Sequence, residues 1–144
     1  MVIVYVLCGI PSSGKSTIAK EICSEYKYNL YSFDSLSKGY KFEERQKVYN
    51  KMYADIATDI VNECGIVYDN LNITYDRRLE LLHALKDIPC KKILIVMTTP
   101  LEECVRRNSQ RQGQARLPDF VIYHLNQKYQ LPSLEEGWDD IQYI

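Results

Sequence analysis

Residues 2–17 read VIVYVLCGIPSSGKST and decide the fold. The run 2–8 is apolar and rich in β-branched side chains, which predicts a strand that is covered on both faces. From Gly9 onward the chain follows the pattern G-x-x-x-x-G-K-S/T (Walker A), whose glycines allow a tight turn with backbone amides pointing inward at a phosphate. A helix beginning at Lys15 would add the partial positive charge of its N-terminus. The stretch therefore predicts a strand, a phosphate-binding loop and a helix in succession, as in the α/β fold of P-loop NTPases.

Apolar runs continue to alternate with helical patterns, which favours one domain over residues 1–144. Strands are expected at 29–33, 66–69, 93–97 and 141–144, and helices at 15–26, 42–64, 75–85, 100–111 and 119–129. Such alternation predicts a mostly parallel central sheet flanked by helices, with right-handed crossovers. In the helix at 75–85, Leu79, Leu82 and Leu85 are expected to point inward. The last two helices and the loop QGQARLP between them are expected to form a mobile lid at about 100–130.

Several polar residues follow directly on the predicted strands. Active sites of parallel sheets lie beyond the carboxyl ends of the strands, where Gly9, Asp34, Asp69 and Thr98 are expected. Lys15 would bridge the β- and γ-phosphates of ATP, and the Ser16 hydroxyl would complete the shell of a Mg²⁺ ion. The residues predicted to bind ATP through this loop are Gly9, Ser12, Ser13, Gly14, Lys15, Ser16 and Thr17.

Two aspartates each allow two interpretations. Asp34 can orient and deprotonate an acceptor hydroxyl as a general base, or it can cap a helix that begins at Ser35. Asp69 can lie beside the Mg²⁺ ion, or it can belong to a turn of Asx residues. Asn72 and Arg77, which follow it, would either face the acceptor or close the same turn.

Composition limits the classes of partner. The chain has 18 basic and 19 acidic residues, a net charge of −1. This balance argues against a protein that coats nucleic acid, because such binding neutralises many phosphates, but not against one that grips a single end. The five scattered cysteines indicate reduced thiols and no structural metal. No signal peptide or membrane-length apolar run is evident, so we expect a cytoplasmic protein without a membrane partner. The pattern indicates no oligomeric state.

The chain resembles the P-loop kinase module of polynucleotide 5′-hydroxyl kinases in four features. These are GIPSSGKST, the aspartate after the second strand, YDNLNITYDRR and TTPLEECVRRNSQR. The ending YQLPSLEEGWDDI is similar to the end of the mammalian kinase domain of this family, so the resemblance covers nearly the whole chain. It implies that ATP, with Mg²⁺, phosphorylates the 5′-hydroxyl end of DNA or RNA. It also implies that Asp34 is the general base, that Arg111 is a lid arginine on the ATP phosphates, and that Arg107 lies nearer the nucleotide base.

The residues themselves are compatible with these roles. Arg107 and Arg111 are four positions apart and would share one face of the helix at 100–111. A guanidinium group suits phosphate oxygens and keeps its charge, so it can stabilise the bond that breaks. The alternative is a solvated basic face, which is the expected role of Arg106.

The acceptor side departs from the family pattern. An arginine is expected three or four residues after the catalytic aspartate, and Ser37 and Lys38 stand there instead. Lys38, Lys41 and Arg45 are the candidates for binding the acceptor's phosphates. Candidates for stacking its terminal base, or merely for packing, are Tyr31, Phe33 and Tyr40. The missing arginine and the near-zero net charge favour an alternative, a kinase of the same fold that acts on a nucleoside, sugar or antibiotic hydroxyl.

Overall fold

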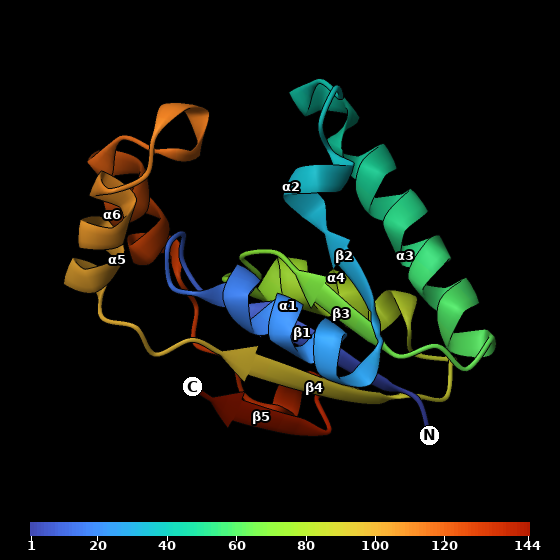
Figure 1. The fold of residues 1–144 in the computed structure, drawn as a ribbon. Helices are drawn as coiled ribbons and strands as arrows, with labels where there is room; N and C mark the ends of the chain where they lie inside the picture. The colour runs from blue at the N-terminus through green and yellow to red at the C-terminus, as the bar shows by residue number, and fades with distance from the viewer.

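A five-stranded, fully parallel sheet forms the centre of the computed structural model, which describes residues 1–144 (Figure 1). The strands are β1 (Ile3–Cys8), β2 (Asn29–Ser32), β3 (Ile66–Asp69), β4 (Lys91–Val96) and β5 (Asp140–Tyr143). Their order is β2-β3-β1-β4-β5, with Cys8 paired to Val96 and Ser32 to Asp69. The carboxyl ends of the strands therefore meet at one edge of the sheet. The predicted α/β P-loop NTPase fold is confirmed.

Helices cover both faces of this sheet. They are α1 (Lys15–Tyr26), α2 (Phe33–Leu36), α3 (Arg45–Val61), α4 (Tyr75–Ala84), α5 (Leu101–Ser109) and α6 (Asp119–Lys128), with short 3-10 turns η1 (Phe42–Glu44), η2 (Gly113–Ala115) and η3 (Leu134–Glu136). The strand β1 alternates between the two faces. Val4, Val6 and Cys8 pack in the cluster that holds α3 and α4, whereas Leu7 packs with Ala19 of α1. Burial on both faces explains the continuous apolar run of β1.

Two segments project beyond the sheet's carboxyl edge and stand apart from each other (Figure 1). We call residues 34–51, which include η1 and the first part of α3, the arm. We call residues 100–130, which include α5, η2 and α6, the lid. The lid packs on the body through a small apolar cluster of Ile10, Ile73, Cys104 and Ile122.

Several boundaries differ from the predicted ones. The strand β2 ends at Ser32, and Phe33 opens α2 because its buried ring stacks on Tyr49 of α3, with ring centroids 4.0 Å apart. The helix α3 begins at Arg45, three residues later than expected, because η1 precedes it. The helix α5 ends at Ser109 rather than at residue 111.

The inward face of α4 was predicted correctly at Leu82 and Leu85 but wrongly at Leu79. Leu79 is 43% exposed, and Leu81 is buried in its place beside Leu82 and Leu85. The helix is rotated because Arg78 is fully buried and forms an ion pair with Glu136, Nε to Oε1 at 2.9 Å. A distant carboxylate thus turns a charged side chain inward.

None of the five cysteines forms a disulfide, and Cys8, Cys90 and Cys104 are buried. No helix has both the length and the apolar character that a membrane crossing requires.

Candidate active site

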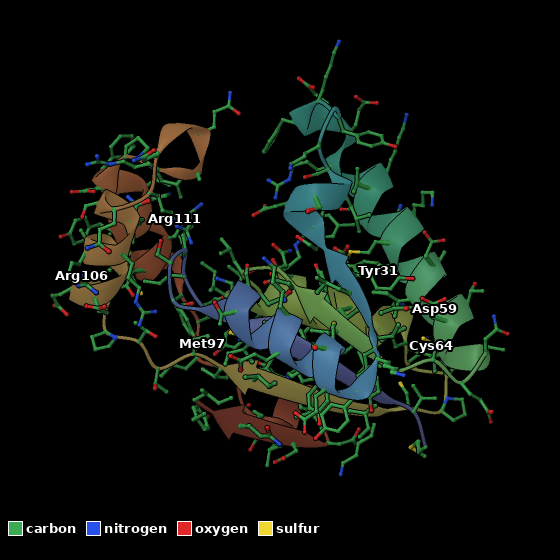
Figure 2. The ribbon with its side chains drawn as sticks, viewed as in Figure 1. Tyr31, Asp59, Cys64, Met97, Arg106 and Arg111 are labelled. Atoms are coloured by element: carbon green, nitrogen blue, oxygen red, sulfur yellow. The ribbon has the colours of Figure 1, made fainter.

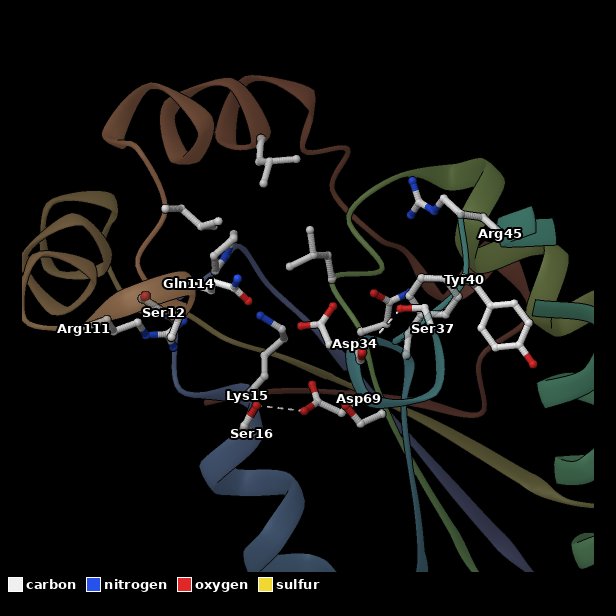
Figure 3. Close-up of a pocket in the computed structure, with 18 of the residues that line it drawn as sticks. Ser12, Lys15, Ser16, Asp34, Ser37, Tyr40, Arg45, Asp69, Arg111 and Gln114 are labelled. Carbon is white, nitrogen blue, oxygen red and sulfur yellow. Dashed lines mark hydrogen bonds between the residues drawn. The ribbon is translucent and has the colours of Figure 1, made fainter. Parts of the chain in front are cut away.

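A pocket of about 700 Å³ lies over the carboxyl ends of the central strands (Figure 3). Its floor includes Lys15 and Ser16 from the start of α1 and Asp69 from the end of β3. One wall is formed by residues 32–45, and the opposite wall by lid residues that include Arg111 and Gln114. The pocket therefore lies between the arm and the lid.

The loop between β1 and α1 is shaped to hold an anion. Gly14 has φ of 99° and Ser12 has φ of 66°, both in the left-handed region that a tight turn requires. A Cβ atom at Gly9 would lie 2.7 Å from Ser13 Oγ, so a side chain there would collide with the loop. The hydroxyls of Ser12 and Ser13 are buried and have no hydrogen-bond partner. Unpaired buried hydroxyls are costly, and a phosphate could accept hydrogen bonds from them.

Lys15 is the charged centre of this loop. The residue is 8% exposed, and its ammonium donates a 2.9 Å hydrogen bond to the carbonyl oxygen of Ile10. Burial lowers the pKa of Lys15, while the nearby carboxylates of Asp69 and Asp34 oppose this shift. An incoming triphosphate would favour the charged form in the same way.

Ser16 and Asp69 face each other across the floor of the pocket. The Ser16 hydroxyl donates a 2.9 Å hydrogen bond to Asp69 Oδ2 (Figure 3). Burial is the main cause that raises the pKa of Asp69, and the Ser16 bond and the Lys15 charge act against it. Hydroxyl and carboxylate oxygens are ligands that Mg²⁺ prefers, and Lys15 would hold the phosphates beside them. The pair therefore fits the predicted Mg²⁺ position.

Asp34 reaches the pocket from the first turn of α2. The residue at the N-cap of that helix is Ser32, so the expected capping of a helix at Ser35 is not what the structure has. Figure 3 shows the Asp34 carboxylate pointing toward the Lys15 ammonium. Asp34, Asp69 and Lys15 thus surround the place where a γ-phosphate on the loop would meet a hydroxyl entering between the two walls.

The two lid arginines do not share a helical face, contrary to the prediction. Because α5 ends at Ser109, Arg111 lies in the following loop, where it lines the pocket (Figure 2). Arg107 stays on the helix, and its Nε donates to Glu103 Oε1 at 3.1 Å. Its Nη1 is 3.4 Å from the position that a Gly14 Cβ would take, so its guanidinium lies over the phosphate loop. Arg106 also pairs with Glu103, whose pKa these partners lower to about 2.

The other predicted loop residues form the structure beneath the pocket. Ser12, Lys15 and Ser16 line it, whereas Gly9, Ser13, Gly14 and Thr17 are not among its lining residues. The glycines and Ser13 shape the turn. Thr17 lies one residue further along α1 and is exposed.

The predicted acceptor residues divide into two groups. Lys41 and Arg45 line the pocket, but Lys38 does not. Asn72 closes the turn after β3, because it is 1% exposed, has φ of 51°, and donates its amide to the carbonyl oxygen of Leu7 at 2.8 Å. Arg77 is also outside the pocket, with its guanidinium 3.7 Å from the ring centroid of Tyr49. The alternative in which these two residues face the acceptor is therefore not what the structure shows.

The aromatic candidates also separate. Tyr31 donates its hydroxyl hydrogen bond to Asp59, away from the pocket (Figure 2). Phe33 lines the pocket but is only 5% exposed, so little of its ring is free to stack on a base. Tyr40 lines the pocket, and so does Phe42, which the sequence reasoning missed. Its signal was present, because Phe42 stands between Lys41 and Arg45, the two arm cations that line the pocket, although the sequence predicts the start of a long helix there.

Charge is distributed unevenly around the pocket. The arm contains five basic and three acidic residues, and the lid has the same numbers. The remaining residues include eight basic and thirteen acidic ones, so the arm and lid are each net +2 and the body is net −5. The near-neutral total conceals two positive projections on either side of the pocket.

Comparisons with known proteins agree with this architecture. The family model of KTI12, described as chromatin associated protein KTI12, matches residues 1–140. The chain belongs to the KTI12 family. The structure of Kti12 from Chaetomium thermophilum in complex with ADP-AlF3 superposes with a TM-score of 0.78 at 18% identity, over 98% of this chain and 88% of that one. A fungal RNA kinase superposes with a TM-score of 0.73 at 17% identity, over 99% and 75%.

Curated relatives of this KTI12-family chain are kinases of different kinds. The bifunctional polynucleotide phosphatase/kinase of Schizosaccharomyces pombe is 26% identical over 147 residues. The match covers 98% of this chain, which spans only 33% of the yeast protein's length. The shikimate kinase of Clostridium botulinum is 27% identical, with 77% of this chain and 68% of that enzyme covered. The resemblance to polynucleotide kinases thus holds at the level of P-loop kinases, within the KTI12 family.

Proposed function

We propose that this chain transfers the γ-phosphate of ATP to the 5′-hydroxyl end of a polynucleotide. The observation that carries the proposal is that one pocket connects three parts in sequence. Lys15, Ser16 and Asp69 form its phosphate side. Asp34 follows, and the pocket then opens onto the positive arm with its exposed cations and aromatic rings.

The loop residues bind and orient the triphosphate. The Lys15 ammonium would exchange the Ile10 carbonyl oxygen for β- and γ-phosphate oxygens, and the free hydroxyls of Ser12 and Ser13 would donate to phosphate as well. Ser16 and Asp69 would hold Mg²⁺, which supplies positive charge to the phosphate oxygens. The helix α1 adds the partial charge of its N-terminus.

Asp34 and the lid act on the transfer itself. Asp34 would accept the proton of the acceptor hydroxyl while the new O–P bond forms and the bond to ADP breaks. Arg111, which keeps its charge, would stabilise the negative charge that develops on the phosphates. Closure of the segment 112–117 over the pocket would exclude water, which would otherwise compete as acceptor.

Charge favours a polynucleotide over a small acceptor. Two net-positive projections beside an acidic body suit a polyanion that enters between them. The match to the S. pombe phosphatase/kinase along 98% of the chain points the same way. The match to a shikimate kinase supports a second candidate, a small hydroxyl compound.

Transfer of labelled γ-phosphate from ATP tests the proposal. The acceptors are 5′-hydroxyl oligonucleotides of DNA and of RNA, together with a panel of small compounds that includes shikimate, gluconate and nucleosides. We expect label on the oligonucleotides. Label that appears only on a small compound would replace the polynucleotide by that compound.

A pair of variants tests the general base in the same assay. Asp34→Asn should retain ATP binding and lose about 10²- to 10⁴-fold in transfer rate. Asp87→Asn, at an exposed position outside the pocket, is the matched control and should transfer normally. Normal transfer by Asp34→Asn would remove Asp34 from the base role.

A further inference from the structure

Phe42 is an apolar ring at the mouth of the pocket. It is 75% exposed although it lines the pocket, and it belongs to no apolar cluster of the core. Tyr40, 52% exposed, lines the same wall. An exposed ring that faces a binding pocket has a free surface for a ligand, whereas isolated exposed apolar residues elsewhere need no such explanation.

A stack of side chains fixes the position of this ring. The Arg45 guanidinium lies 5.0 Å from the centroid of Phe42 and 5.5 Å from that of Phe33. Phe33 is buried, stacks on Tyr49, and directly precedes Asp34 in the chain. Phe42 is therefore connected through Arg45 and Phe33 to the carboxylate that would receive the acceptor's proton. Arg45 contacts one side of the Phe42 ring, and most of the ring remains exposed.

The size of the pocket limits what enters with the hydroxyl. About 700 Å³ must hold the phosphates of ATP and the terminal nucleoside of the acceptor, and a cavity of this size accommodates ligands of the dimensions of a single small molecule. A terminal base pair would add a second nucleotide to the contents of this volume. The volume thus favours an end whose last base is unpaired.

We propose that Phe42 stacks the terminal nucleobase of an unpaired 5′ end while Arg45 binds the adjoining phosphate. The inference rests on the proposed function and names its substrate class as single-stranded ends. Every nucleobase has an aromatic face, so this contact predicts little preference among the four bases. Arg45, held between two rings, presents charge to the backbone rather than to a base edge.

The test combines a variant of the ring with an acceptor that lacks the base. Phe42→Ala should raise the KM for a single-stranded 5′-hydroxyl oligonucleotide roughly tenfold, with the KM for ATP unchanged, as expected for loss of one base–aromatic stack. Phe42→Trp should keep the wild-type KM. Phe120→Ala is the matched control, since Phe120 is 73% exposed on α6 but does not line the pocket.

An oligonucleotide with an abasic 5′-terminal nucleotide isolates the stacking contact. The wild type should use it about as poorly as Phe42→Ala uses the complete oligonucleotide, and the variant should not distinguish the two acceptors. A duplex with a recessed 5′ end should be a poor acceptor for the wild type. In the Phe42→Trp, Asp34→Asn double variant, adding the single strand should quench the new indole's fluorescence, independently of turnover.

The outcomes separate the two levels of the proposal. Absence of transfer to any oligonucleotide by the wild type would overturn the proposed function and this inference together. Transfer that is equally efficient with abasic or recessed ends, or unaffected by Phe42→Ala, would overturn the stacking role alone. A Phe42→Ala protein with an altered thermal transition would be replaced in the comparison by Phe42→Leu, for which the same loss is expected.

Discussion

The two sides of the pocket are built on opposite physical principles. On the phosphate side, Ser12, Ser13, Lys15 and Asp69 are each at most 9% exposed. Their orientation is set by the loop backbone and by the Lys15–Ile10 and Ser16–Asp69 hydrogen bonds. On the acceptor side, the pocket-lining side chains of the arm are exposed apart from the half-buried Ser37, and Arg45 is positioned mainly by two aromatic rings.

This difference follows from what each side binds. A triphosphate has the same shape in every turnover, so buried dipoles and charges can be fixed around it in advance. Buried charges without their ligand reduce the stability of the fold, as the raised pKa of Asp69 and the lowered pKa of Lys15 indicate. An acceptor with a variable base is better served by solvated cations and an aromatic face. Function thus opposes stability on one side of the pocket and hardly affects it on the other.

Among these variants, Lys15→Ala on the phosphate side should cause the largest loss of turnover. Removing the buried ammonium takes away the charge on the β- and γ-phosphates, so we expect turnover to fall by at least about 10²- to 10³-fold. Titration calorimetry with ATP and the transfer assay measure binding and turnover separately. Lys20→Ala, at an exposed position on the same helix, is the control. Normal turnover by Lys15→Ala would show that the loop does not hold the reacting phosphates.

Asp69→Asn should change activity and stability in opposite directions. Loss of the carboxylate should lower Mg²⁺-dependent turnover roughly 10- to 100-fold. Since burial raises the pKa of Asp69 in the fold, the folded protein binds this proton more tightly than the unfolded chain does. The wild type's free energy of unfolding should therefore fall as pH rises from the unfolded pKa to the raised folded one, and stay lower above it.

The amide of Asp69→Asn can still accept the Ser16 hydrogen bond but cannot ionise, so this pH-dependent loss should disappear. Thermal unfolding at a series of pH values gives the difference between the two proteins. We expect the variant to gain stability relative to the wild type through that window and to unfold at a higher temperature at pH 7. A variant that is less stable at pH 7 would mean that the Asp69 carboxylate contributes to the fold even without its ligand.

The phosphate side could be predicted from the sequence because its determinants are local. The strand, the loop from Gly9 and the start of α1 are contiguous, and each follows from glycine conformation and hydrophobic pattern. Asp69 could be placed because it ends an apolar strand of the sheet. These features depend little on how the rest of the chain packs.

The acceptor side could be predicted only in part because its geometry depends on distant contacts. Phe33 leaves the strand because it stacks on Tyr49, which carries Asp34 into α2. Arg77 was expected to face either the acceptor or a turn, and it lies instead on the other side of the same tyrosine. Phe42 follows a lysine in a polar segment, and only the folded arm shows that it faces the pocket. The position of one ring in α3 thus decided the assignments of Asp34 and Arg77, which no local pattern contained.

The smallest predicted effect is a loss of oligonucleotide affinity on the acceptor side, where two cations of the arm can be compared. Arg45 lines the pocket and Lys38 does not. Arg45→Ala should weaken binding of a 5′-hydroxyl oligonucleotide about five- to tenfold, because one exposed, charge-assisted phosphate contact is lost. Its plot of log affinity against log salt concentration should be shallower by about 0.7, the contribution of one phosphate on a single strand. Lys38→Ala should leave both values close to those of the wild type, and both variants should bind ATP normally.

If Arg45→Ala and Lys38→Ala instead reduce the salt dependence by the same amount, the arm would attract the polynucleotide through its total charge, and the ring-bound position of Arg45 would have no separate role. A change in slope confined to Arg45→Ala would mean that a side chain can be specific while exposed, provided that its neighbours fix its direction.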